Sequence, residues 1–218
     1  MKTILLAINN LINMKNKNIE ENNKEIKVIE DTQYVIIDEE NNEEGRILKT
    51  DFNLKLIFEK KGVSAEILGI FNLEKGKEIK LVTSTKHIAS NTSCNTFIKA
   101  VLNDNSSFDY KGKILIGKKG IQTNAFLHDN VLVAGENTKR NSQPILEIEA
   151  NDVKASHGST TGRIDENQFY YLKSRGLGEE EAKDLIKEGF LVSLVDKIKD
   201  NKIREIVLNK IKSKREYL

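Results

Sequence analysis

The chain has 218 residues, of which 38% are apolar and 31% are charged, with no Trp and a single Pro. Its 35 Lys and Arg stand against 33 Asp and Glu, so a net charge of +2 creates no global field toward nucleic acid or an anionic membrane. Lys and Arg are also not interleaved with aromatic residues, as a groove for single-stranded nucleic acid would require. We expect an ordinary soluble domain with a real core and no nucleic-acid partner.

The single cysteine, Cys94, excludes an intramolecular disulfide and an all-cysteine metal site within one chain. Its presence alone fits a reducing compartment. The apolar stretch 4–8 near the N-terminus is broken by Asn9 and Asn10 and has no A-x-A-like cleavage site after it, which argues against a signal peptide. No other stretch approaches the roughly 18 apolar residues of a membrane span. We therefore expect a cytoplasmic protein with no membrane partner.

Composition divides the chain into zones. Residues 1–25 add a polar Asn/Lys/Glu run to the short apolar stretch, and we expect an N-terminal segment or linker there. Residues 26–164 carry β-branched runs such as IKVIE, YVIID, LKLIFE and EIKLVTS, separated by turn formers such as Gly62 and Lys75-Gly76. The end of this zone, 151–164, is rich in small polar residues and is predicted to be a loop.

The predicted strands have no amphipathic helices between them, so a doubly wound α/β sheet is not expected. Apolar pairs such as Ile79/Leu81, Ile114/Leu115 and Leu132/Val133 recur at intervals of roughly 14–19 residues, which suits the stacked coils of a β-solenoid. A β-sandwich would favour hairpin dipeptides such as Asn-Gly or Asp-Gly, and this zone has neither. The pattern alone leaves both all-β folds open.

Residues 165–218 are predicted to be helical. Asp165 can cap the N-terminus of the first helix, and the Gln168 side chain, three residues later, can accept a bond from the Asp165 backbone N–H. Gly176 is suited to end this helix. Three glutamates follow Gly178 at the start of a second helix, where the helix dipole favours negative charge. Apolar residues then recur at helical spacing, with Gly189 as a candidate break. Helices this short must pack on the β-zone or on another protein.

Several stretches then carry a family resemblance. TSCNTFIKAVL (92–102), FDYKGKILIGKKGIQTNAF (108–126) and QPILEIEANDVKASHGSTTGRID (143–165) resemble the SufB/SufD family of SUF iron–sulfur cluster assembly scaffolds. In that family F-x-G-K-I, T-x-A and P-x-L-E-I lead into D-V-x-x-S-H-G-x-T-x-G-x-x-D. The stretch QFYYLKSRGLGEEEAKDLIKEGFLVSLVDKI (168–198) is similar to the family's F-Y-L-x-S-R-G-x-x-x-x-E-A pattern. Residues 1–89 match no motif of the family.

The resemblance implies a mainly β fold, a right-handed parallel β-helix built as a single-stranded solenoid, followed by a small C-terminal helical domain. It places the β-helix core at 26–164 and a helical domain for ATPase docking at 165–218. The implied partners are a SufC-like ABC-type ATPase and a second SufB/SufD-type subunit. That subunit could be another copy of this chain or a paralogue, so a homodimer and a heterodimer both remain open. No cofactor is held permanently, and a transient iron–sulfur cluster is expected at the subunit interface.

His157 is the first candidate for cluster assembly, because its match in SufD-like proteins lies at that interface. Neutral imidazole is a borderline ligand that suits iron, so His157 is a candidate iron ligand. The small residues around it would leave the ring accessible. The alternative is that His157 only hydrogen-bonds a turn before the first helix.

Asp129 stands where SufB proteins have their functional cysteine, which makes this chain SufD-like. A carboxylate can bind iron but cannot accept sulfur as a persulfide does. Its neighbour His128 could add a ligand, although an Asp–His pair at a β-turn is more often solvated surface. Cys94 is a weaker candidate, since a lone cysteine beside a strand is usually a small buried hydrophobe. His87 is weaker still.

The resemblance assigns ATPase docking to the helical tail, with Tyr170, Arg175, Leu177 and Phe190 as the candidate partner-binding residues. Arg and aromatic side chains are the types that anchor interfaces. The alternative is that the apolar residues of the tail face the β-helix.

The sequence offers little for an enzyme. It has no G-x-x-x-x-G-K-[ST] phosphate loop, no G-x-G-x-x-G and no G-x-S-x-G nucleophile elbow. The alternatives to a scaffold are a β-helix carbohydrate lyase or acyltransferase-like enzyme, and a purely structural dimerisation module. In the enzyme, His157 would be the general base and Asp129 or Asp152 its acid partner.

Overall fold

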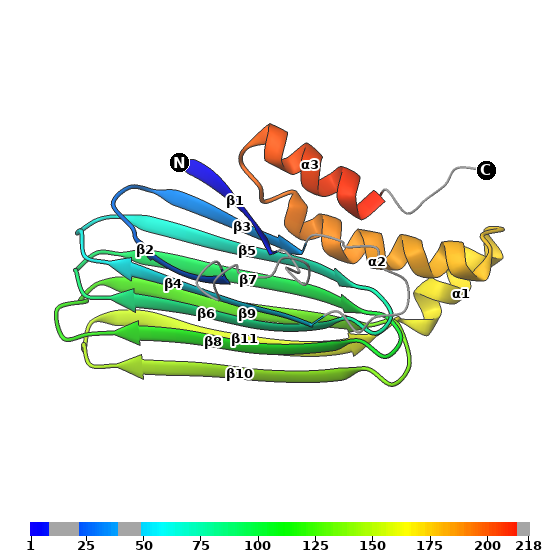
Figure 1. Ribbon diagram of the computed structural model, residues 1–218, viewed down its shortest axis with the longest axis horizontal. Helices are drawn as coiled ribbons and strands as arrows, with labels where there is room; N and C mark the ends of the chain where they lie inside the picture. The colour runs from blue at the N-terminus through cyan, green and yellow to red at the C-terminus, as the bar shows by residue number, and fades with distance from the viewer. Residues whose placement is uncertain (9–21, 39–48, 213–218) are drawn as a thin grey trace, which may run out of the picture.

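The computed structural model describes residues 1–8, 22–38 and 49–212. Within these ranges the chain forms eleven strands followed by three helices (Figure 1). The strands are β1 (Lys2–Ile8), β2 (Asn23–Lys27), β3 (Thr32–Asp38), β4 (Lys49–Phe58), β5 (Ser64–Leu73), β6 (Glu78–His87), β7 (Ser93–Leu102), β8 (Ser107–Ile116), β9 (Thr123–Val133), β10 (Lys139–Ile148) and β11 (Val153–Arg163). The helices are α1 (Glu166–Ser174), α2 (Glu179–Val195) and α3 (Asn201–Lys212).

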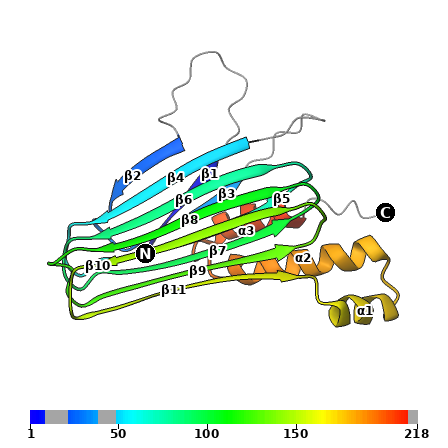
Figure 2. The same cartoon turned by 90° about the horizontal axis from the view of Figure 1, so that it is seen from below.

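The strands build two parallel sheets. Sheet A has the order β1-β3-β5-β7-β9-β11, and sheet B has the order β10-β8-β6-β4-β2. Consecutive strands alternate between the sheets, so each turn of the chain contributes one strand to either side (Figure 2). The result is a parallel β-helix of about five turns with helices at its C-terminal end. The predicted β-helix followed by a small helical domain is therefore confirmed, and the sandwich alternative is wrong.

The corners of successive turns repeat the same backbone geometry. Gly62, Asn91 and Gln122 occupy equivalent corners and have positive φ angles of 76°, 55° and 58°. Gly and Asn adopt this left-handed conformation more readily than other residues. Gly62 N–H donates to the Ser90 carbonyl, and Asn91 N–H donates to the Ile121 carbonyl, at 3.3 and 2.9 Å. Each corner is thus hydrogen-bonded to the next, and the turn predicted at Gly62 belongs to this stack.

The burial of each strand depends on what covers its outer side. Every residue of β3 is buried, because its inner side faces the core of the β-helix and its outer side lies under the helices. In β10, exposed and half-buried residues alternate along most of the strand, since the outer face of sheet B is open to solvent. The core inside the β-helix is mainly aliphatic and aromatic, with fully buried Phe58, Phe71 and Phe108.

Helix α2 fixes the helical domain to the outer face of sheet A. Its buried residues Leu191, Leu194 and Val195 pack against a second apolar cluster that includes Val101 and Leu132 of the sheet. Helix α1 has no buried residue and lies beyond the ends of the strands (Figures 1 and 2). Among the described helices, none combines the length and the apolar composition needed to cross a membrane.

Three expectations need correction. The segment 1–25 is not only a linker, because residues 2–8 pair with β3 as the edge strand β1, and 23–25 open β2. The predicted loop at 151–164 is largely strand β11. Its backbone pairs with β9, and this pairing does not depend on the small polar side chains that suggested a loop. Helix α2 continues through Gly189 without a break.

Candidate functional site

The last turn of the β-helix carries the first predicted site residue. His157 lies in β11, in register with Leu127 of β9, whose side chain is buried in the core. Register partners in a parallel sheet point to the same side, so His157 is on the core-facing side of its strand. It is nevertheless exposed, because β11 is the edge of sheet A among the described strands and no further turn covers it. The ring is accessible, as the sequence predicted, but on a strand instead of a loop.

Asp129 lies one strand inward, in register with Ser159 of β11. Its side chain is fully buried and its Oδ2 accepts a bond from Arg140 Nη2 at 2.7 Å. The same nitrogen donates to Ser159 Oγ at 2.5 Å, and Ser159 Oγ donates to Ser142 Oγ at 3.2 Å. Arg140 and Ser142 come from β10, so these bonds join the two sheets at the open end of the β-helix.

His128 does not join Asp129, although the two are neighbours in sequence. Successive side chains of a strand point to opposite faces, and His128 therefore lies on the outer face of sheet A. Its ring stacks on Phe97 with centroids 5.9 Å apart, beside Gly158 of β11. Asp129 and His128 both lie in the middle of strand β9 and not at the expected β-turn. The structure places His157 and Asp129 on the same side of two neighbouring strands and His128 on the opposite side.

Cys94 lies inside the β-helix, on β7, with 1% of its surface exposed. Burial raises the pKa of its thiol to about 12, so the thiol form persists at neutral pH. A thiolate is the form that binds iron or carries sulfur, and this environment opposes it. These facts favour the reading of Cys94 as a small buried hydrophobe.

Sequence reasoning missed Arg140, Ser142 and Ser159. The alternation in KRNSQPILEI could have placed Arg140 and Ser142 on one side of a strand. What it could not supply is the register that sets Arg140 across the interior from Asp129. That register depends on the lengths of the corners between strands.

In the helical tail, three of the four predicted partner-binding residues are at least partly accessible on or after α1. Tyr170 and Arg175 are exposed, and Leu177 is half-buried after the helix. Asp165 caps α1 by accepting bonds from the backbone N–H groups of Asn167 and Gln168. Because α1 buries no residue of its own, its aromatic surface is available to another protein.

Phe190 differs from the other three. It is on α2, half-buried against the apolar cluster of sheet A, and the Lys99 ammonium lies 4.4 Å from its ring centroid. Lys99 Nζ also donates to the Phe190 carbonyl at 2.8 Å. Phe190 therefore faces the β-helix, which is the alternative considered for the apolar residues of the tail.

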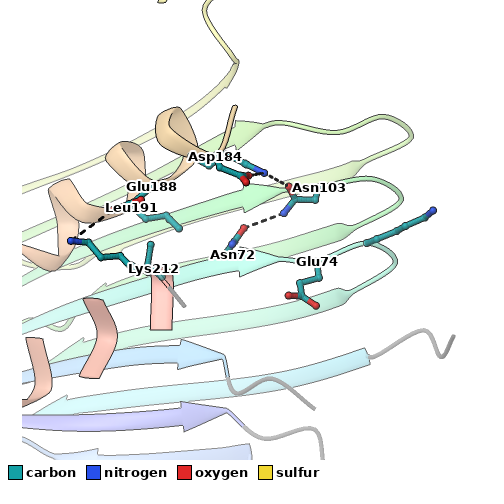
Figure 3. Close-up of a pocket in the computed structure, with 10 residues that line it drawn as sticks. Asn72, Glu74, Asn103, Asp184, Glu188, Leu191 and Lys212 are labelled. Atoms are coloured by element: carbon teal, nitrogen blue, oxygen red, sulfur yellow. Dashed lines mark hydrogen bonds and ion pairs between the residues drawn. The ribbon is translucent and has the colours of Figure 1, made fainter. Parts of the chain in front are cut away.

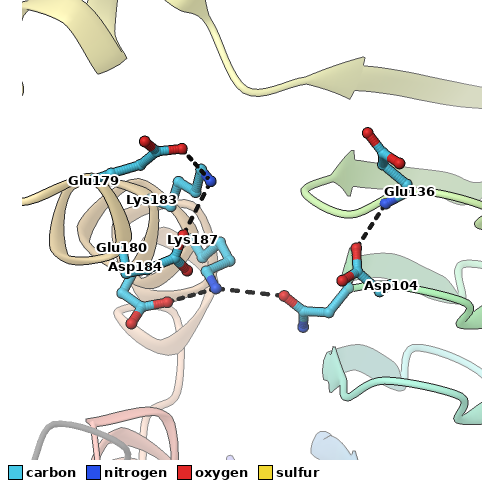
Figure 4. A network of polar contacts seen from close by, with 8 residues as sticks. Asp104, Glu136, Glu179, Glu180, Lys183, Asp184 and Lys187 are labelled. Carbon is cyan, nitrogen blue, oxygen red and sulfur yellow. Dashed lines mark hydrogen bonds and ion pairs between the residues drawn. The ribbon is translucent and has the colours of Figure 1, made fainter.

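A polar cavity of about 380 Å³ lies between α2, α3 and the ends of β5 and β7 (Figure 3). Asn103 Nδ2 donates to Asn72 Oδ1 at 3.1 Å, and Asn103 Oδ1 accepts from Lys187 at 3.4 Å. Lys187 also pairs with Asp184 at 2.5 Å, within a wider network on α2 (Figure 4). Since charges of both signs line this cavity and bind one another, we assign it to the attachment of α2 on the β-helix.

No group of three His, Cys, Asp or Glu side chains within the described residues is close enough to hold a metal ion. His157 and Asp129 alone would supply two ligands.

The fold is a parallel β-helix whose sheets end, among the described strands, at β10 and β11 in the last turn and at β1 and β2 in the first, and strand edges of this kind can pair with another chain. Residues 6–190 match the family described as SUF system FeS cluster assembly, SufBD core domain. The chain therefore belongs to the SufBD core family, as its motifs suggested.

Curated relatives agree with this family. The chain is 34% identical over 113 residues to the iron–sulfur cluster assembly protein SufD of Escherichia coli (strain K12), covering 52% of this chain and 27% of the relative. It is 30% identical over 169 residues to an iron–sulfur cluster assembly SufBD family protein of Mycobacterium leprae (strain TN), covering 74% and 43%. It is 33% identical over 114 residues to SufD of Bacillus subtilis (strain 168), covering 52% and 26%. The chain thus spans less than half the length of these relatives.

Proposed function

We propose that this chain is a scaffold subunit of iron–sulfur cluster assembly. It pairs with a second SufB/SufD-type subunit through the open last turn of its β-helix, and it binds a SufC-like ABC-type ATPase through its helical domain. His157 and Asp129 lie at the paired interface, where a cluster forms transiently. The chain itself catalyses no reaction and keeps no cofactor. The domain division is kept with one change: strands β1 and β2 join the β-helix core predicted at 26–164, and the helical domain that follows from 165 carries the docking helix α1.

The observation that carries this proposal is the free edge at the last turn. Among the described strands, β11 ends sheet A and β10 ends sheet B, so both present unpaired backbone groups on one side. Natural proteins usually cover or charge such edges. Strand β11 carries charges near its ends, Lys154 and Arg163. Its middle, however, presents the small residues Gly158 and Ser159 next to His157. A second chain can approach this edge closely.

The docking surface for the ATPase is supported by the position of α1. Tyr170 is 74% exposed and Tyr171 59%, on a helix that projects beyond the strands. Large exposed aromatic side chains beside an Arg are typical anchors of an interface. The C-terminal half of α2 packs on sheet A. A movement of α1 on binding the ATPase would therefore be passed through α2 to the β-helix.

The experiment is a co-purification of the full chain with the ABC-type ATPase from the same genome. A cut before Asp165 would uncover the apolar cluster under α2, so point substitutions are the cleaner test. Tyr170→Ser changes only exposed surface, and we expect it to lower the amount of retained ATPase about tenfold. Ile206→Ser on α3 is the matched control, because Ile206 is also exposed, at 52%, but lies on another helix.

If the folded wild-type chain retains no ATPase, the docking proposal is wrong. The same holds if Tyr170→Ser retains as much ATPase as the wild type, or if Ile206→Ser loses as much as Tyr170→Ser. Circular dichroism of each variant would establish that the fold is intact.

A further inference from the structure

The ion pair at the last turn is incompletely satisfied. Asp129 is fully buried, and its Oδ1 has no hydrogen-bond partner while Oδ2 is held by Arg140. Arg140 Nε is likewise buried without a partner. Buried polar atoms are nearly always hydrogen-bonded, and an exception within one ion pair calls for an explanation. A purely structural pair would be expected to use both carboxylate oxygens.

The surroundings of this pair suit a cation. The unpaired Oδ1 is an oxygen ligand in a buried position at the open end of the β-helix. His157 lies on the same side of β11 as Ser159, two residues away, and Ser159 is the register partner of Asp129. The register therefore places a carboxylate, an imidazole and a hydroxyl on the same side of neighbouring strands at this edge. Such a mixed oxygen and nitrogen set suits ferrous iron better than a soft monovalent metal.

Arg140 prevents this use of Asp129 in the chain alone. Its guanidinium neutralises the carboxylate and would repel a divalent cation placed beside Oδ1. It also has another anchor, because the same Nη2 donates to Ser159 Oγ and Ser142 lies next to Ser159. The guanidinium could thus leave Asp129 and remain hydrogen-bonded at the edge.

We propose that Arg140 is a latch that closes a ferrous iron site at Asp129, and that the site opens when the guanidinium turns away. This inference rests on the proposed function, since it concerns the regulation of the same assembly site. Pairing of a second subunit along β11 would shift Ser159 and with it the position of Arg140. The chain alone would then bind iron weakly through Asp129, and a second chain would supply the remaining ligands. Arg140 acts through Asp129 and is a positioning residue.

The test is anaerobic calorimetric titration of the full chain with ferrous iron alone, in the absence of any assembly partner. Arg140→Gln removes the charge but keeps a hydrogen-bond donor beside Asp129. We expect this variant to bind ferrous iron at least about tenfold more tightly than the wild type. Arg140→Lys retains the charge and should show no such gain. The double variant Arg140→Gln/Asp129→Asn should lose the gain, because the carboxylate is then absent.

The latch is wrong if Arg140→Gln binds no more tightly than the wild type, or if the double variant keeps the gain. Arg140→Ser, which leaves room for water beside Asp129, is the second variant if Arg140→Gln does not fold. If neither variant folds, Arg140 is a fixed structural partner, which also overturns the proposal. Iron titration needs no ATPase and no cluster. If Arg140→Gln shows no gain in iron binding but the chain still supports cluster assembly, the latch is wrong and the proposed function stands. If the gain in iron binding is present but cluster assembly fails, the latch stands and the proposed function is wrong.

Discussion

Cys94 illustrates how position decides the chemistry of a residue. Its thiol is buried between the sheets, and burial raises the pKa to about 12. We predict that a maleimide reagent at pH 7 will not label the folded chain, and that labelling will become complete in denaturant, because only the unfolded chain exposes a reactive thiol. Mass spectrometry measures the labelled fraction. Rapid labelling of the folded protein would show that the thiol is accessible and would restore Cys94 as a functional candidate.

His87 predicts a pH dependence of stability. Its ring is fully buried, stacks on Phe58 and bonds Thr92 Oγ1 through Nδ1 at 2.8 Å. Burial lowers its pKa from 6.5 to about 4. Between these values the unfolded chain binds a proton that the folded chain does not. The contribution of neutral His87 to the free energy of unfolding is therefore fully present above about pH 6.5 and is lost as the pH falls toward 4.

We predict that the free energy of unfolding of the wild type falls between pH 6.5 and 4 by on the order of 3 kcal/mol more than that of His87→Gln. Glutamine cannot titrate but can still bond Thr92. Urea denaturation at several pH values measures both curves. Parallel curves for the two proteins would mean that His87 is protonated equally in both states.

The attachment of α2 to sheet A depends on a buried polar side chain as well as on apolar packing. Gln33 of β3 donates to the Lys197 carbonyl at 2.9 Å and accepts from the Lys199 N–H at 3.0 Å. It also donates to Glu66 at 2.6 Å. These bonds satisfy two backbone groups of the chain just after α2, which would otherwise be left without partners in a partly buried place.

We predict that Gln33→Ala lowers the free energy of unfolding by about 1–3 kcal/mol, because it leaves buried groups unsatisfied. Lys55→Gln is the control, since it removes only an exposed ion pair with Glu25 and should cost less than about 1 kcal/mol. Chemical denaturation compares the two. Equal effects would mean that Gln33 does not hold the helix.

The strands were predictable from sequence where their composition is distinctive. The β-branched runs and the turn at Gly62 follow from local preferences that the fold retains. The strand β11 was missed, because its SHGSTTG segment has the composition of a loop. Its extended conformation is imposed by pairing with β9, a contact between distant parts of the chain. The strand β1 was missed for another reason: its apolar run is short, and a polar Asn/Lys/Glu stretch follows it.

The site was predictable only in part. The resemblance singled out His157 and Asp129, and the register of β9 and β11 puts both on the same side of neighbouring strands. His128 was included because it adjoins Asp129 in sequence, but strand alternation sends it to the opposite face. Arg140 carries no motif, and its role depends on the stacking of two sheets. Sequence patterns give the period along one strand but not the alignment between strands.

At the level of the complete chain, the β-helix has a covered face and an open end. The helices protect one face of sheet A, whereas β10 and β11, like β1 and β2 at the other end, have a neighbouring strand on one side only among the described strands. This asymmetry separates the two proposed contacts: α1 for the ATPase and the last turn for a second subunit.

The most direct measurement is reconstitution of an iron–sulfur cluster on the complex of this chain with its ATPase and second subunit, followed by visible absorbance. We predict that His157→Ala leaves the complex assembled but abolishes the cluster signal. His128→Ala, on the opposite face of the same sheet, should retain it. A full signal from His157→Ala, or an equal loss from both variants, would contradict the assignment of the assembly site to the open last turn.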